Sequence, residues 1–198
     1  AASDVYKRQI MAQCTPKSFD LTGKVALITG ASYGIGMAIA KAMAANGATI
    51  VFNDIKQELV DKGVAAYKEE GIEAHGYVCD VTSEDAVNEM VGKIEKEVGV
   101  VDILVNNAGI AQQKLLTDIT DEDWRRMLDV NLSGAFYVTR AVLPGMISLK
   151  SGSIVNVSSV WGQVGASCEV HYSAAKAGLI GLTRALAKEV GPSGVTVN

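Results

Sequence analysis

The chain has 198 residues, of which 48% are hydrophobic and 20% are charged, and its 18 basic and 22 acidic side chains give a net charge of −4. This length fits one domain, and the acidic balance without a Lys/Arg-rich run argues against a nucleic-acid or membrane partner. No apolar stretch approaches the ~20 residues of a membrane-spanning helix, and three widely spaced cysteines predict neither disulfides nor a metal site. We therefore expect a soluble, cytoplasmic domain.

Both ends of the chain raise separate expectations. Residues 1–10 contain the run DVYKRQ, which matches a translated sequencing-library end. We therefore expect a non-native leader and a native start at Met11; an ordinary leader is the alternative. The sequence stops at Asn198 inside an expected strand, so we expect residues 11–198 to form a single domain that is incomplete at its C-terminus. Such a fragment should be poorly stable and inactive.

Strands and helices are expected to alternate along the whole chain. Apolar runs, helical patterns and glycine stops predict a strand at 24–29, a helix at 37–45, a strand at 49–52, a helix at 56–70, a strand at 73–79, a helix at 83–98, a strand at 102–105, a helix at 121–149 with or without a break, a strand at 153–157, a helix at 171–190 and a strand at 195–197. Because the strands are apolar on both faces, this order predicts an α/β fold: a doubly wound parallel sheet of the Rossmann type, ending before its last strand.

A glycine-rich turn joins the first expected strand to the first expected helix, with the sequence Thr29-Gly30-Ala31-Ser32-Tyr33-Gly34-Ile35-Gly36. Gly30 permits a tight turn, and Gly34 and Gly36 let the backbone approach a pyrophosphate and the helix pack on the strand. Free N–H groups and the helix dipole favour phosphate there. Three glycines alone fit a merely structural turn, but this strand and helix context predicts a dinucleotide site.

Asp54 follows the second expected strand, 18 residues beyond Gly36. An acid near this spacing accepts hydrogen bonds from ribose hydroxyls and repels a 2′-phosphate, which favours NAD(H) over NADP(H). Tyr33 supplies no cation for that phosphate, whereas nearby Lys56 leaves NADP(H) open. A solvated turn residue is the alternative for Asp54.

Two polar segments follow the third and fourth expected strands: Asp80-Val81 and Asn107-Ala108-Gly109. The carboxyl ends of parallel strands are where such sheets bind ligands. Asp80 is equally well explained as a cap of the next helix, and Asn107 as an Asx turn.

Tyr172 and Lys176 are the candidate catalytic pair. Four residues apart on a helix, they share one face, and the ammonium would lower the phenol pKa from its usual ~10, making Tyr172 a usable general acid or base. Ser159, thirteen residues before Tyr172, would hold a substrate carbonyl. His171 points to another face of the helix and is expected to be a rim residue.

The motifs TGASYGIG, NNAG, Val130-Asn131-Leu132, NVSS and YSAAK occur in an order and spacing that resemble the short-chain dehydrogenase/reductase family, over residues 20–198. The resemblance implies that Tyr172 is the acid/base, that Lys176 binds the nicotinamide ribose and assists Tyr172, and that Ser159 orients the carbonyl. It implies that Asn131 holds a water of a proton relay. It further implies cofactor contacts from Gly30, Ser32, Tyr33, Gly34, Ile35, Gly36, Asp54, Asp80, Val81, Asn107, Ala108, Gly109, Tyr172 and Lys176.

Substrate and assembly are less constrained. Residues 52–82 resemble gluconate 5-dehydrogenases, whereas the chain from Ala111 onward resembles 3-oxoacyl-carrier-protein reductases. Either two genes are joined near residues 106–109, or one natural subfamily has mixed features. We expect a 3-oxoacyl-reductase-like enzyme, with a gluconate dehydrogenase or a non-catalytic dinucleotide-binding protein as alternatives. The helix at 171–190 is apolar nearly all round, which predicts a homodimer or homotetramer.

Overall fold

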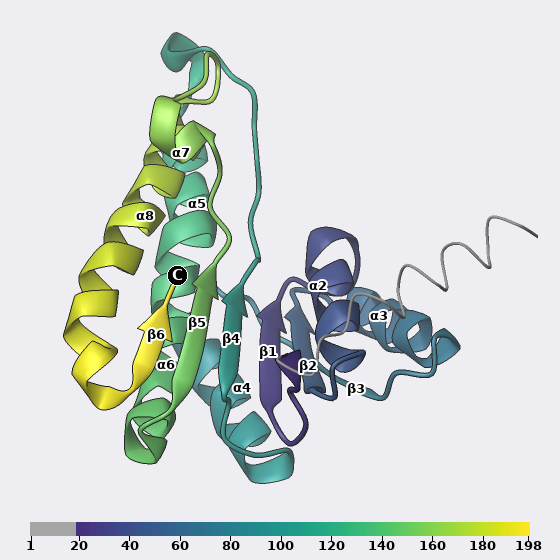
Figure 1. Cartoon of the computed structure of the whole chain (residues 1–198). Coiled ribbons are helices and arrows are strands. Elements are labelled where there is room, and N and C mark those ends of the chain that lie inside the picture. Colours follow the sequence, from purple (N-terminus) through teal and green to yellow (C-terminus); the bar gives the residue numbers. More distant parts are fainter. Residues whose placement is uncertain (1–18) are drawn as a thin grey trace, which may run out of the picture.

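A computed structural model describes residues 19–198 and shows one six-stranded, fully parallel sheet in the order β3-β2-β1-β4-β5-β6 (Figure 1). Residues 1–10 and Met11 lie outside the described part. The strands are β1 (Val25–Thr29), β2 (Thr49–Asp54), β3 (Ala74–Val78), β4 (Ile103–Asn106), β5 (Gly152–Asn156) and β6 (Val195–Val197). Since β1 pairs with both β2 and β4, the winding reverses between β1 and β4. The expected doubly wound sheet is confirmed.

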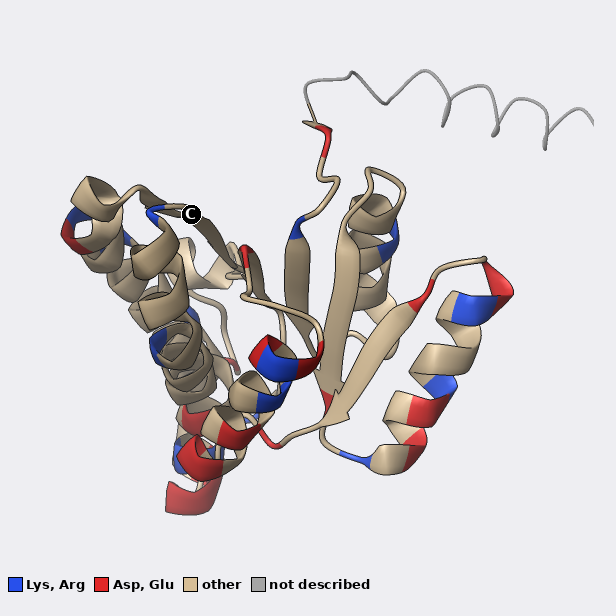
Figure 2. Cartoon of the chain, turned by 90° about the horizontal axis from the view of Figure 1, so that it is seen from below, with Lys and Arg blue, Asp and Glu red and all other residues tan. Residues whose placement is uncertain are grey.

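Helices cover both faces of this sheet. They are α2 (Gly34–Ala44), α3 (Gln57–Glu69), α4 (Glu84–Glu97), α5 (Asp121–Leu128), α6 (Gly134–Leu149), α7 (Trp161–Val164) and α8 (Val170–Val190), with short 3₁₀ turns at Leu116–Asp118 and Gly191–Ser193. Charged residues lie on helices and loops, whereas Asp54 is the one charged residue in the six strands (Figure 2).

Two hydrophobic clusters, one on each face, explain why the strands read as continuous apolar runs. Alternate residues of β1 point to opposite sides: Leu27 packs with α4, α6 and α8, and Ile28 packs with α2 and α3. Both side chains are fully buried. The sheet is therefore held from both sides, and its strand ends are fixed in space.

The break left open in the expected helix at 121–149 exists, as a π-helical turn at Asp129–Ser133 between α5 and α6. Within residues 19–198, the continuous segment Asp121–Leu149 is long and apolar enough to cross a membrane by length and composition, which the sequence reading did not anticipate. The core helices of water-soluble proteins pass the same test, and here Val138, Val142 and Met146 pack in the core. The segment therefore gives only weak support for a membrane span.

Other elements agree with the predicted order but differ in extent. The first helix begins at Gly34, three residues early, since the glycine-rich turn leads straight into it, and β2 extends to Asp54. The four-residue helix α7 was not predicted, because one helical turn has too few positions to show a period.

Tyr67 supplies a test of how the core supports the glycine-rich turn. Its side chain is fully buried in α3, and its hydroxyl donates to the Ala31 carbonyl at 2.8 Å. Tyr67→Phe leaves this carbonyl buried without its partner, which should lower the free energy of unfolding by about 1–3 kcal/mol. Tyr77→Phe is the matched control, because the Tyr77 hydroxyl bonds Glu97 at the surface and its loss should cost about 0.5 kcal/mol or less. Equal effects in urea unfolding would contradict this difference.

Candidate functional site

A cavity of about 920 Å³ opens at the carboxyl ends of the central strands, where the winding of the sheet reverses between β1 and β4. It is lined by the glycine-rich turn, by the residues that follow β2, β3 and β4, and by one side of α5. The predicted cofactor residues found there are Gly30, Tyr33, Gly34, Ile35, Asp54, Asp80, Val81, Asn107, Ala108 and Gly109. This is the place where open α/β sheets bind ligands.

The glycine-rich turn is shaped for close approach. Gly34 has φ +65°, a conformation that favours glycine, and opens α2. A Cβ on Gly36 would lie 2.5 Å from Asn107 Nδ2 and 2.9 Å from the Gly30 carbonyl oxygen, so no larger residue fits. Tyr33, the N-cap of α2, makes no side-chain capping bond, which leaves the first amides of the helix open to an anion.

Ser32 differs from its neighbours in this turn. Its side chain is buried, and its Oγ has no hydrogen-bond partner among residues 19–198. The side chains of Tyr33 and Ile35 are instead 65% and 69% exposed on the cavity side. The turn thus presents backbone and two exposed side chains to the cavity, while Ser32 faces the protein.

Asn107 ties the ends of β1 and β4 together. Its Nδ2 donates to the Thr29 and Gly30 carbonyl oxygens at 2.9 and 3.1 Å, and the amides of Asn107 and Ala108 both donate to Thr29 Oγ1 at 3.0 and 2.9 Å. We call these four bonds the Thr29–Asn107 clasp. The amide side chain is occupied by the protein backbone, so Asn107 shapes the cavity floor through these bonds.

Asp54 is placed as its spacing predicted, at the end of β2. Its carboxylate is mostly buried, lines the cavity, and accepts from the Ile55 amide at 2.9 Å. Lys56 is exposed and lies outside the lining residues. The nearest cationic side chain in the sequence therefore does not face the cavity.

Asp80 forms an Asx turn, with its Oδ1 accepting from the Thr82 amide at 2.9 Å and from Thr82 Oγ1 at 2.8 Å. The alternative that Asp80 caps the next helix is wrong. Ser83 is the N-cap of α4, since its Oγ accepts from the Ala86 amide at 3.3 Å. The turn directs Asp80 and Val81 toward the cavity.

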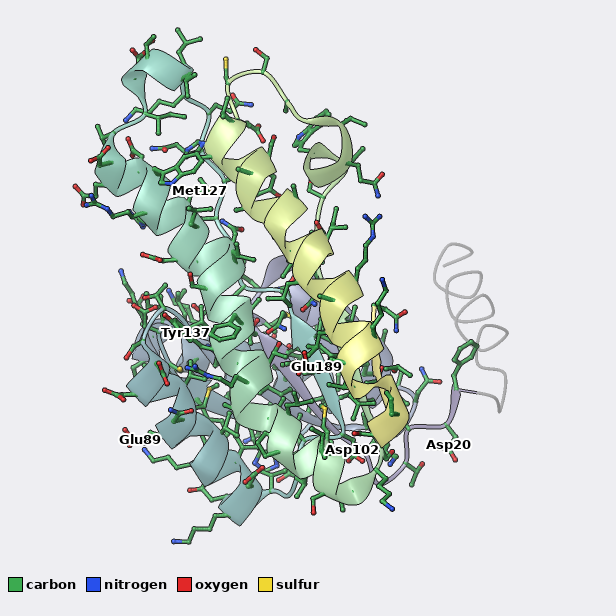
Figure 3. All side chains as sticks on the ribbon, turned by 90° about the vertical axis from the view of Figure 1, so that its left-hand side faces the viewer. Asp20, Glu89, Asp102, Met127, Tyr137 and Glu189 are labelled. Carbon is green, nitrogen blue, oxygen red and sulfur yellow. The ribbon has the colours of Figure 1, made fainter. Side chains whose placement is uncertain are left out.

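Tyr172 and Lys176 lie on α8, which runs alongside α5 and α6 (Figure 3). Lys176 is 95% buried; its Nζ donates to the Val157 carbonyl at 2.8 Å and lies 5.7 Å from the centre of the Tyr172 ring. Burial lowers the pKa of Lys176 below its usual value. An ammonium held beside a phenol in this way can favour the loss and return of the phenolic proton.

Ser158 and Ser159 follow β5 and have different partners. Ser158 Oγ donates to the Lys176 carbonyl at 3.0 Å and so joins β5 to α8. Ser159 Oγ accepts from the Trp161 amide at 3.2 Å, which leaves its hydroxyl proton for another acceptor. The structure thus separates a serine that joins β5 to α8 from one whose hydroxyl proton is not used within the described residues.

Asn131 is the buried residue at the centre of the π-helical turn. Its Nδ2 donates to the Ile110 and Met127 carbonyls at 2.9 and 3.1 Å, and its Oδ1 has no partner within residues 19–198. A Cβ built on Gly109 would lie 2.7 Å from this Oδ1 and 3.6 Å from Lys176 Nζ. The unpaired acceptor and the buried ammonium therefore face the same small space, a suitable place for a bridging water.

Sequence reasoning missed two features of this region. Glu122, Arg125 and Arg126 of α5 and Asp129 and Val130 of the π-helical turn line the cavity, and no cofactor motif marks them because they meet the cavity only through the packing of these elements. The expectation that His171 is a rim residue is wrong: its side chain is fully buried, because Gln112 supplies a hydrogen-bond partner 2.9 Å away. Among residues 19–198, no cluster of three or more His, Cys, Asp and Glu side chains is placed to hold a metal ion.

Comparisons with known proteins agree with this geometry. A family model described as short chain dehydrogenase matches residues 24–198. The chain is 45% identical over 180 residues to a 3-oxoacyl-[acyl-carrier-protein] reductase of Thermotoga maritima, covering 90% of this chain and 72% of that protein.

Solved structures with high similarity include a 2-keto-3-deoxy-D-gluconate dehydrogenase from Streptococcus agalactiae. It is 56% identical, with a TM-score of 0.78, over 89% of this chain and 66% of that one. An NAD⁺-bound xylitol dehydrogenase is 38% identical, with a TM-score of 0.86, over 90% of this chain and 69% of that one.

Cys79 provides a chemical test of the cavity wall. Its thiol is 3% exposed, and burial, with smaller contributions from Asp80 and Glu89, raises its pKa to about 11. Because the thiolate is the reactive form, and roughly one thiol in a thousand is ionised at pH 8, labelling should be slow there and should accelerate about tenfold per pH unit. Labelling by iodoacetamide in a Cys14→Ser/Cys168→Ser background measures this. In 8 M urea the rate should level off above about pH 8.5; the same profile without urea would contradict the assigned environment.

Proposed function

The chain belongs to the short chain dehydrogenase family of oxidoreductases, and we propose that it transfers a hydride between NAD(H) and a carbonyl or secondary alcohol of a small-molecule substrate. Family members bind nicotinamide dinucleotides. The observation that carries the proposal is the buried Lys176 ammonium beside the Tyr172 ring, at the edge of a cavity built on a glycine-rich turn. A protein without this chemistry has no physical need for a buried charge there.

The residues present fit a dinucleotide. Open amides at the start of α2 suit the pyrophosphate, and Asp54 suits the adenosine ribose hydroxyls. Asp80 and Val81 would lie beside the adenine. At the other end, Lys176 uses one of its three N–H donors on Val157, and the others remain for a ribose hydroxyl. When bound, the nicotinamide supplies or accepts the hydride.

Tyr172 is the proposed general acid in carbonyl reduction and the general base in alcohol oxidation. Its hydroxyl gives a proton to the oxygen that develops negative charge, and the nearby Lys176 ammonium stabilises the phenolate that remains. Ser159, whose proton is free to point outward, donates to the same substrate oxygen and orients the carbonyl. Fixed donors on α8 and after β5 thus surround one reacting oxygen.

Asn131 and Lys176 are proposed to return the proton to Tyr172 through water. Asn131 Oδ1 is an unpaired buried acceptor, and it faces the space beside Gly109 that Lys176 Nζ also faces. A water held there would accept from Lys176 and donate to Asn131. The π-helical turn supports this proposed role, because Nδ2 of Asn131 donates to the Ile110 carbonyl and Oδ1 is left facing this space.

The preference for NAD(H) over NADP(H) follows from charge. A 2′-phosphate would stand beside the Asp54 carboxylate, and Lys56 is outside the cavity. Arg125 and Arg126 line the cavity from α5, and Asp121 pairs with Arg125 at 3.5 Å. The lining also holds Asp54, Asp80, Glu122 and Asp129, so its acidic side chains outnumber its two arginines, and this balance disfavours an added phosphate.

For the substrate, we favour a sugar acid that carries the reacting carbonyl or hydroxyl. The 56% identity to a 2-keto-3-deoxy-D-gluconate dehydrogenase over 89% of the chain supports this. A 3-oxoacyl thioester is the second candidate, supported by the 45% identity to a 3-oxoacyl-carrier-protein reductase. Turnover of 2-keto-3-deoxygluconate and of acetoacetyl thioesters, followed at 340 nm, separates the two.

We further propose a cytoplasmic homodimer or homotetramer in which residues 11–198 contribute one dinucleotide-binding catalytic domain. The outer face of α8 exposes a row of small residues at Ala174, Ala177, Gly181 and Ala185, and Phe136 of α6 is 41% exposed. A second copy is the simplest cover for such a surface.

Tyr172→Phe tests the acid/base role directly. The change removes the hydroxyl and keeps the ring, so kcat should fall by about 10²–10⁴-fold while the Kd for NADH stays within about twofold. Stopped-flow turnover and NADH fluorescence titration measure the two quantities. Tyr137→Phe, on α6 and outside the cavity lining, is the matched control and should keep full activity. Nearly normal turnover in Tyr172→Phe would contradict the acid/base role of Tyr172.

Asp54→Ala tests the origin of cofactor preference. Losing a charge-assisted contact to the ribose should reduce kcat/KM for NADH about tenfold or more, and removal of the carboxylate should improve kcat/KM for NADPH. Asp54→Asn should shift both values in the same direction but by less. Asp61→Asn, exposed on α3, controls for general charge and should change neither. Preference for NADPH in the unmutated protein would overturn the assignment.

A further inference from the structure

His171 is a buried polar residue that the proposed mechanism does not use. It lies directly before Tyr172 on α8, is fully buried, and places its Nε2 2.9 Å from Gln112 Oε1. Gln112 lies in the segment between β4 and α5, 59 positions away in the sequence. Because neighbours on a helix point to different faces, His171 reaches this segment while Tyr172 faces the reacting side.

The direction of this hydrogen bond follows from its next partner. Gln112 Nε2 donates to Asp123 Oδ1 at 3.0 Å, and a carboxylate only accepts. The Gln112 amide is thereby oriented with its carbonyl oxygen toward His171, so His171 must donate from Nε2. The other ring nitrogen, Nδ1, has no partner within residues 19–198.

Asp123 anchors the far end of the chain of bonds. Lys114 Nζ contacts its Oδ2 at 2.6 Å, and the Thr120 amide and hydroxyl donate to the same oxygen. These contacts hold the pKa of Asp123 well below its usual range, and the contact with Lys114 has the largest effect. Asp123 therefore stays a carboxylate near neutral pH and keeps Gln112 in its orientation.

The segment 110–114 is fixed on both sides next to the catalytic residues. At its start, Asn131 Nδ2 donates to the Ile110 carbonyl, and Gly109 just before it lies beside Lys176. Farther along, the Lys114 amide donates to the Cys168 carbonyl at 2.7 Å. A small cavity of about 220 Å³ adjoins the segment at Ile110, Gln112 and Asp123. Within residues 19–198, segment 110–114 makes two side-chain bonds to α8 and its N-cap, Gln112–His171 and Gln113–Glu169, and only the first has a fully buried partner.

We propose that His171 is a positioning residue for the substrate: through Gln112 it holds segment 110–114 against α8, and so fixes the substrate-facing wall beside Tyr172. This role rests on the proposed function, because the wall matters only if the reacting carbonyl lies at Tyr172. It predicts that loss of the bond weakens substrate binding more than it slows the chemical step, while cofactor binding at the glycine-rich turn is unaffected.

The test compares four variants of the full chain: His171→Leu, which removes the donor; His171→Gln, whose amide can restore it; Gln112→Leu, which removes the acceptor; and the double variant with both leucines. Gln113→Leu is the matched control, since Gln113 bonds Glu169 at the exposed surface at 3.3 Å. The readouts are KM and kcat for the carbonyl substrate, Kd for NADH, hydrogen exchange of residues 110–120, and the ¹⁵N shifts of His171. If His171→Leu fails to fold, Gln112→Leu carries the test, because it deletes the same bond from the half-buried segment.

The proposal expects a KM increase of about tenfold in His171→Leu and Gln112→Leu, the factor given by one lost hydrogen bond, with kcat and Kd within about threefold. Hydrogen exchange of 110–120 should accelerate by a similar factor, with recovery in His171→Gln. The double variant should be no worse than either single one. The ¹⁵N shifts should show an Nε2–H tautomer.

Unchanged exchange and KM in both leucine variants would overturn the role, as would losses that simply add, an Nδ1–H tautomer, or a lower melting temperature with no change specific to the segment. Failure of the proposed function gives a different result. In that case the unmutated chain turns over no carbonyl substrate, whereas the exchange and ¹⁵N measurements still decide whether His171 holds the segment.

Discussion

The Thr29–Asn107 clasp is the constraint on which the rest of the site depends. Parallel strands β1 and β4 are neighbours in the sheet, but the winding reverses between them, and the cavity lies beyond their carboxyl ends. Four hydrogen bonds hold the two strand ends at a fixed distance. These bonds fix the position of the glycine-rich turn relative to the segment after β4.

The clasp also explains why Gly36 must be a glycine. The Asn107 amide occupies the space where a Cβ would stand, so the first turn of α2 can pack directly over the ends of β1 and β4. The anion-binding end of α2 is thereby aimed over the cavity floor. The Asn107 side chain thus couples the glycine-rich turn, the proposed phosphate site, to the segment after β4, where Gly109 lies beside Lys176.

The proposed catalytic side of the molecule contains a buried charge, the Lys176 ammonium. Lys176 gains one carbonyl acceptor from Val157, which offsets only part of the cost of burying an ammonium, and burial accordingly lowers its pKa. Asn131 likewise keeps an unpaired oxygen in the same region. Unpaired buried acceptors are rare in proteins, and one that faces the same space as a buried ammonium supports a site for a water and a polar ligand.

Sequence alone predicted the sheet, the helices and the cofactor turn because each is encoded locally, in apolar runs, glycine positions and strand-to-helix order. The pair Tyr172 and Lys176 was predictable because helix geometry fixes their relative placement. The burial of His171 was not, since it depends on Gln112, a residue that only the tertiary fold brings within 2.9 Å. The α5 residues in the cavity wall and the true cap of α4 were missed for the same kind of reason: neighbours in space decide them.

A crystal structure of the protein with bound NAD⁺ tests the central claim most directly. The account predicts the pyrophosphate over the first amides of α2, the adenosine ribose within hydrogen-bond distance of Asp54, and the nicotinamide ribose at Lys176 with the ring facing Tyr172. It also predicts an unchanged Thr29–Asn107 clasp and a water between Lys176 and Asn131. A dinucleotide bound elsewhere, or one whose nicotinamide ring lies away from Tyr172, would contradict the account.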